Sequence, residues 1–94
     1  LLSVNKTSSY AMLEIGHCYE KIGITSNALA YYYKSVHYDP LMDKAWYRLA
    51  KYFLKNKNYK KANDYIEKAI RINQEKPKYW KLYLKCASLI SAKN

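Results

Sequence analysis

The feature that most constrains this chain is a helical pattern of apolar residues that recurs every 34 positions. In the stretch 43–56, apolar side chains fall three, four and seven positions apart, so they share one face of an α-helix. This face consists of Trp46, Leu49, Ala50 and Phe53. After the polar stretch 56–58, a second helical face consists of Ala62, Ile66 and Ala69. Because small residues allow two backbones to approach closely, the pattern predicts a helical hairpin that stacks on copies of itself.

A copy of this hairpin precedes it, and a copy of its first helix follows it. A step of 34 residues carries Met12 to Trp46 and then to Trp80. In the second predicted helix the same step carries Ala28 to Ala62. The apolar residues keep helical spacing throughout, so the sequence predicts stacked helix pairs and no strand.

The period and its residue types resemble the tetratricopeptide repeat family. The matching residues of the first copy are Met12, Ile15, Gly16, Tyr19, Gly23, Ala28, Tyr32 and Pro40. Those of the second copy are Trp46, Leu49, Ala50, Phe53, Tyr59, Ala62, Ile66 and Ala69. The resemblance covers nearly the whole chain and implies an all-α, right-handed solenoid of antiparallel helix pairs with about five helices. Two departures are Lys57, where the family prefers glycine, and Gln74, where it prefers proline.

The period also predicts how the chain is divided. We expect the end of a preceding repeat's second helix at 1–8, repeats at 9–42 and 43–76, and a further first helix or capping helix at 77–94, which suggests a piece of a longer protein. The expected helices run from about Tyr10 to Lys21, Asn27 to Tyr38, Lys44 to Lys55, Tyr59 to Ile72 and Lys78 to Ile90. The expected amino-terminal caps are Ser8 or Ser9, Thr25 or Ser26, Asp43 and Asn58, with Pro77 in the last helix's first turn.

Residues suited to catalysis or cofactor binding do not form a recognisable motif. The sequence has no glycine-rich phosphate loop, no His-Glu-x-x-His and no Gly-x-Ser-x-Gly, and its seven acidic side chains are dispersed. Two acid–base groups must converge in one pocket to work together, and nothing predicts such a pair. We therefore expect a non-catalytic chain without a cofactor.

Cysteine and histidine spacing predicts neither a disulfide nor a metal site. Cys18 and Cys86 lie two whole repeats apart, beyond the roughly 7 Å between Cα atoms that a disulfide spans. His17 and His37 fall on different predicted helices, so no metal site is predicted. Free thiols, and a start without a signal-peptide pattern, favour a reducing compartment such as the cytoplasm. No apolar run is long enough for a transmembrane helix, so direct membrane insertion is not expected.

Positive charge is concentrated in the second part of the chain. Of 17 basic and 7 acidic side chains, residues 1–42 contain three of each. Residues 43–94 therefore contain 14 basic and 4 acidic side chains, which account for the whole net charge of +10. A field this uneven attracts acidic partners.

The resemblance implies where a partner binds, because the first helices of family members line a concave groove that holds extended peptides or partner helices. The implied groove residues are Tyr10, Leu13, His17, Lys44, Tyr47, Arg48, Lys51, Lys55, Lys78, Lys81 and Lys85. Basic groups beside aromatic ones suit carboxylates and apolar anchors, which we expect beside Tyr47 or Leu13. Some family members clamp a carboxyl-terminal carboxylate; Lys44 and Arg48 fit part of that clamp, but Glu14 replaces its asparagine, so the clamp is not supported.

We therefore predict a protein–protein interaction scaffold that binds an acidic peptide or partner segment in the groove. One alternative is RNA or polyanion binding by the lysine-rich half, although Trp46 and Trp80 are expected in the core and leave few aromatic side chains for stacking. Another is a structural spacer or oligomerisation segment of a larger signalling or envelope protein that self-associates through its solenoid ends, because the last predicted helix is apolar on more than one face. A merely solvated lysine surface is the remaining interpretation.

Overall fold

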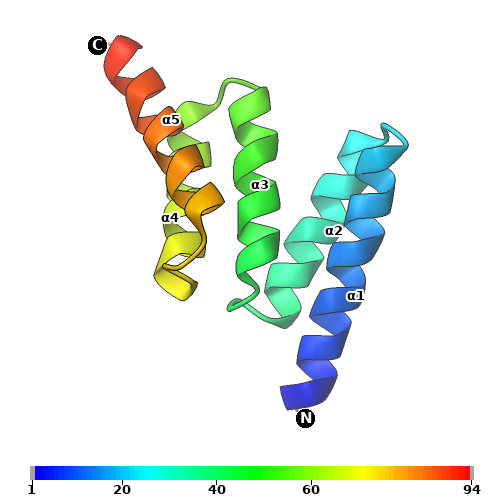
Figure 1. The fold of residues 1–94 in the computed structure, drawn as a ribbon. Helices are drawn as coiled ribbons and strands as arrows, with labels where there is room; N and C mark the ends of the chain where they lie inside the picture. The colour runs from blue at the N-terminus through cyan, green and yellow to red at the C-terminus, as the bar shows by residue number, and fades with distance from the viewer. Residues whose placement is uncertain (1, 94) are drawn as a thin grey trace.

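The computed structural model describes residues 2–93, with side chains from 4 to 92, and this stretch contains only helices and turns. The helices are α1 (Leu2–Lys21), α2 (Thr25–Tyr38), α3 (Asp43–Lys55), α4 (Tyr59–Ile72) and α5 (Pro77–Lys93). In Figure 1, α1–α2 and α3–α4 form two antiparallel hairpins side by side, and α5 lies along α4 at the far end. The predicted all-α solenoid of antiparallel helix pairs is confirmed.

The core follows the predicted apolar faces. Its first cluster joins α1, α2 and α3 and consists of Leu13, Ala28, Tyr32, Val36, Ala45 and Leu49. Its second cluster joins α3, α4 and α5 and consists of Ala50, Ile66, Ala69, Ile70 and Tyr79. Because α3 contributes to both clusters, it links the first hairpin to α4 and α5.

The repeat is visible in the contacts as well as in the pattern. The Trp46 indole N–H donates to the carbonyl oxygen of Pro40 at 2.7 Å, and the Trp80 indole N–H donates to that of Gln74 at 2.8 Å. Pro40 and Gln74 are 34 residues apart, as are Trp46 and Trp80. Since only a carbonyl oxygen is needed, glutamine in place of proline leaves this contact intact.

The two hairpin turns use the same backbone conformation. Gly23 between α1 and α2 has φ of 87°, and Lys57 between α3 and α4 has φ of 65°. The left-handed region suits glycine, whereas a side chain there costs about 1 kcal/mol. The departure at Lys57 therefore changes the stability of the turn without changing its shape.

The predicted start of the first helix is wrong. Helix α1 begins at Leu2 instead of Tyr10, so residues 2–8 are continuous with 9–21 and do not form a separate helix end. No glycine or proline interrupts the first turns. The expected cap Ser9 is buried and uses its hydroxyl to bond Ser35 of α2. Leu1 lies outside the described residues, and the division of the chain into repeats stays a prediction.

Two of the predicted caps are also wrong. The residues that precede α2 and α3 are Ile24 and Met42, and neither cap has a side-chain hydrogen bond. Asp43 instead directs its carboxylate at α5, where it accepts a hydrogen bond from the Tyr79 hydroxyl at 2.7 Å. The predicted Asn58 cap is confirmed, because its side chain accepts from the backbone N–H of Lys61.

The outer side of α5 corrects one core assignment. Trp80, expected in the core, is 42% exposed, and Leu84 on the same helix is 63% exposed. Trp80 lies beside Ile70 and Arg71 of α4, so this neighbouring helix covers it only in part. The prediction that the last helix is apolar on more than one face is consistent with these exposures, while self-association stays a prediction.

Candidate functional site

Helices α1, α3 and α5 meet around a cavity of about 290 Å³, which we call the basic cavity. It is lined by Leu13, Glu14, His17, Lys44, Tyr47, Arg48 and Lys78. Three helices that are distant in sequence contribute to it, and the 34-residue step relates Leu13 of α1 to Tyr47 of α3, and Lys44 of α3 to Lys78 of α5. Six of the seven lining residues were predicted for the groove; Glu14 is the addition.

Tyr47 organises the wall of this cavity that α3 and α5 share. Its ring centroid lies 4.9 Å from that of Tyr79, whose hydroxyl is bonded to Asp43. The ammonium nitrogens of Lys78 and Lys51 lie 5.0 Å and 5.5 Å from the Tyr47 ring centroid. These are cation–π distances, so the Tyr47 ring attracts the ammonium groups of both lysines.

The positive charges around Tyr47 repel one another. The pKa of Lys78 is held below its usual value, first by burial and then by the neighbouring charges of Lys76, Arg48, Lys44 and Lys51. Like charges that crowd together disfavour the charged form of each. A negatively charged group placed in the basic cavity would relieve this repulsion.

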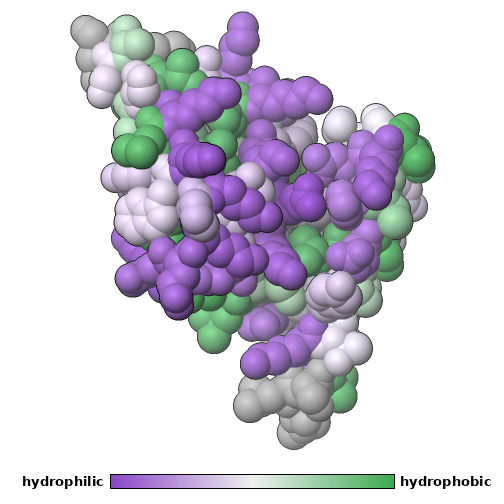
Figure 2. Space-filling model, viewed as in Figure 1, coloured by the Kyte–Doolittle hydropathy of each residue, from purple (hydrophilic) through white to green (hydrophobic). Residues whose placement is uncertain are grey.

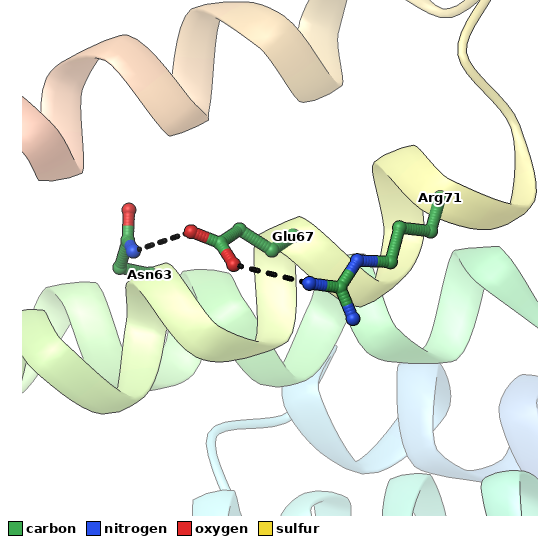
Figure 3. A network of polar contacts seen from close by, with 3 residues as sticks. All are labelled: Asn63, Glu67 and Arg71. Atoms are coloured by element: carbon green, nitrogen blue, oxygen red, sulfur yellow. Dashed lines mark hydrogen bonds and ion pairs between the residues drawn. The ribbon is translucent and has the colours of Figure 1, made fainter.

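The ion pair found among the described residues lies outside the basic cavity. On α4, Arg71 and Glu67 approach to 3.8 Å, and the Asn63 amide donates to the other oxygen of Glu67 at 3.0 Å (Figure 3). This network joins residues of one helix at an i, i+4 spacing and is worth a few tenths of a kcal/mol, about 0.3–0.5. It leaves the cationic cluster of α3 and α5 without a paired carboxylate in the part of the chain that the structure describes.

A second cavity of about 420 Å³ lies between α3, the α3–α4 turn and α5, and we call it the α3–α5 cavity. Its lining residues are Tyr47, Lys51, Leu54, Lys55, Lys57, Tyr59, Leu82, Lys85 and Leu89. Tyr47 lines both cavities, so the two adjoin at this side chain. Together they form one surface over α3 and α5, and Figure 2 shows hydrophilic side chains over most of the middle of this face.

The predicted groove residues divide between these cavities. The basic cavity brings together Leu13, His17, Lys44, Tyr47, Arg48 and Lys78, and the α3–α5 cavity brings together Tyr47, Lys51, Lys55 and Lys85. Tyr10 and Lys81 are exposed and line neither cavity. Leu13 is only 4% exposed and packs in the first core cluster, so it offers little surface to an anchor.

Sequence reasoning missed the leucines of the α3–α5 cavity. Leu82 and Leu89 lie seven positions apart, a spacing that places them on one face of α5. That spacing could have identified them, but the 34-residue step directs attention to Trp80 and Tyr83 instead. Leu54 follows the apolar face of α3 by one position, so only the packed structure shows which side it takes.

Neither cysteine lines these two cavities. Both thiols are free: Cys18 is exposed, while Cys86 is buried, and burial raises the pKa of its thiol. No cluster of histidine, cysteine or acidic side chains suited to a metal ion occurs among the residues described. Between residues 2 and 93, the helices are too short or too polar to cross a membrane.

Residues 25–86 match the family model described as Tetratricopeptide repeat. The match spans α2, α3, α4 and the first half of α5, which is more than half of the 94-residue chain and includes most of the basic side chains around Tyr47. No curated protein matches the sequence.

Proposed function

The chain belongs to the tetratricopeptide repeat family, whose domains generally mediate protein–protein interaction, and on this premise we propose that it binds an acidic peptide segment across α1, α3 and α5. The proposal makes it a non-catalytic scaffold whose partner lies in the groove formed by the basic cavity and the α3–α5 cavity.

One observation carries this proposal: Lys44, Arg48 and Lys78 line a single cavity with one carboxylate, Glu14, and none of the three cations forms an ion pair among the described residues. Arginine can hold a carboxylate through two parallel hydrogen bonds, and Arg48 is half-buried, which reduces competition from water. Lys78 gains as well, because a carboxylate beside it offsets the neighbouring positive charges that lower its pKa.

The energy available from each pair is modest. Exposed charge pairs contribute about 0–1 kcal/mol each, so a single surface lysine would not hold a partner. Several pairs in one cavity also raise the association rate of an acidic segment, and that effect decreases as salt increases. We therefore expect weak binding of an acidic peptide, which decreases further as the salt concentration rises.

The test uses a fluorescent peptide that contains several aspartates and glutamates, and its counterpart with asparagine and glutamine. We expect only the acidic peptide to bind, and Arg48→Gln to weaken it by about 10-fold, as for a hydrogen-bonded charge pair. Lys60→Gln is the matched control, since Lys60 is an exposed cation on α4, outside both cavities, and its loss changes the net charge equally. Equal effects of the two substitutions would show general charge attraction and would contradict the proposal.

The polyanion alternative is separated by salt. RNA held through phosphates should lose affinity linearly on a log–log plot against salt concentration, with a slope set by the number of contacts. Base stacking on Tyr47 has little room, because Tyr79, Lys78 and Lys51 already pack around its ring. Tight RNA binding that Arg48→Gln reduces would replace the peptide proposal.

A further inference from the structure

The α3–α5 cavity differs in kind from the basic cavity beside it. Its leucines come from two helices: Leu54 from the last turn of α3, and Leu82 and Leu89 from one face of α5. Its other lining side chains are two tyrosines and four lysines, with no acidic residue. An apolar surface inside a ring of cations is suited to an apolar group whose neighbours are negatively charged.

The surface of this cavity is held in place by the core. Leu82 packs against the second core cluster, so its position is fixed by the buried side chains of α4 as well as by α5. At the opposite edge, the left-handed conformation of Lys57 turns the chain tightly from α3 into α4 and places this lysine at the cavity. Because Leu82 is already packed, this part of the site needs no ordering before it binds an apolar group.

The spacing of the two cavities limits what can occupy both. Leu54 follows Arg48 by six residues on α3, a rise of about 9 Å at 1.5 Å per residue. A peptide in the extended polyproline II conformation advances about 3.1 Å per residue with three residues per turn, so side chains three positions apart share one face and lie about 9 Å apart. A partner segment could therefore place a carboxylate beside Arg48 and, about three residues away, a side chain among the leucines.

We propose that the α3–α5 cavity is an anchor site for one bulky apolar side chain of an extended acidic segment, about three residues from the carboxylate that enters the basic cavity. This inference rests on the proposed function and specifies its partner. A second copy of this chain is a poor occupant, because its net charge of +10 opposes approach to the ring of lysines. The leucines add affinity for an apolar side chain, and the lysines select acidic neighbours.

The first experiment varies the peptide and keeps the protein unchanged. One peptide has an aspartate followed three positions later by leucine within an otherwise acidic sequence; a second has alanine in place of that leucine; a third has the leucine directly after the aspartate. We expect the second and third peptides to bind about 10-fold more weakly than the first, because loss of a buried anchor removes apolar contact without changing charge.

The second experiment varies the protein. Leu89→Gln should weaken the leucine peptide about 10-fold and leave the alanine peptide unchanged, so that the two losses are not additive. Leu84→Gln is the matched control, since Leu84 is exposed on the same helix and lines neither cavity. Unchanged binding of the alanine peptide also shows that the Leu89→Gln protein is folded.

The outcomes separate the two proposals. If leucine and alanine peptides bind equally while Arg48→Gln still weakens both, the anchor site is wrong and the acidic groove stands. If binding of the leucine peptide does not depend on where the leucine lies, the spacing argument is wrong and the anchor is overturned. If no acidic peptide binds, the proposed function and the anchor site fail together.

Discussion

The two hairpins follow the same 34-residue pattern, yet they fill the space between their helices in opposite ways. In the α1–α2 hairpin, the ring of Tyr32 packs directly on Gly16, where an added Cβ would lie 2.7 Å from the ring. In the α3–α4 hairpin, the equivalent residues are Ile66 and Ala50, both fully buried. A larger residue on the second helix is matched by a smaller one on the first.

Polar contacts differ in the same way. Between α1 and α2, the hydroxyls of Ser9 and Ser35 each donate to the other residue's carbonyl oxygen at 2.8 Å, and Tyr32 donates to Glu20. The α3–α4 hairpin instead surrounds the ring of Tyr65 with aromatic rings, whose centroids lie 5.5 Å away for both Trp46 and Phe53. The period therefore fixes which positions meet, while the residues present fix how they are joined.

The largest expected effect comes from giving one hairpin the residue that the other hairpin has at the equivalent position. Gly16→Ala should lower the free energy of unfolding by about 2–3 kcal/mol, because the added methyl group overlaps the Tyr32 ring. Urea unfolding followed by helical circular dichroism measures the change. The reciprocal substitution Ala50→Gly should cost about 1 kcal/mol, from lost helix propensity and a lost methyl contact.

A double variant sharpens this comparison. Gly16→Ala combined with Tyr32→Ile copies the α3–α4 arrangement, so it should be more stable than the two separate losses predict. If the losses of unfolding free energy in the two single variants simply add in the double variant, the residues at the two positions are not matched in size.

The next effect compares buried tyrosines of the two regions. Burial raises the pKa of Tyr32 and Tyr79 above the usual value, and the hydrogen bonds to Glu20 and Asp43 add to the increase. The folded protein therefore holds these phenolic protons more tightly than the unfolded chain does. Stability from this source is fully present below pH about 10 and is lost as the pH rises further. Denaturant unfolding at pH 8 to 11 should show the decrease.

Tyr79→Phe tests the part of this decrease that belongs to α5. The variant should lose stability less steeply above pH 10, although it starts from a lower value because the Asp43 bond is gone. An unchanged slope would place the effect entirely in the first hairpin.

The smallest effect concerns the two turns. Lys57→Gly should raise the free energy of unfolding by about 0.5–1 kcal/mol, because glycine adopts the left-handed conformation without a Cβ penalty. Gly23→Ala should lower it by about 1 kcal/mol for the converse reason, although no atom lies within 4 Å of the added methyl group. Thermal melting of both variants measures the pair. A gain in stability for Lys57→Gly together with a loss for Gly23→Ala supports the comparison of the two turns. A change in the same direction for both variants would contradict it.

The site was only partly predictable from sequence. Lys44, Arg48 and Lys78 could be placed on one surface because the period relates their helices, and the structure brings them to one cavity. The same logic made Leu13 a surface residue, whereas it packs in the core, because a period of 34 says which positions correspond and not how far each helix is rotated. Leu54, Leu82 and Leu89 required the packed helices before their shared cavity could be seen.

The sequence by itself determined the helices, the hairpins and the apolar faces, because these depend on residues within one or two turns of each other and on a repeated step. It also determined the uneven charge, which is a matter of counting. Only the tertiary structure decided that Ser9 bonds Ser35 instead of capping a helix, that Asp43 bonds Tyr79 instead of capping α3, and that Trp80 is exposed. Each of these depends on which side chain from another helix, or none, is within reach, and local spacing does not contain that distance.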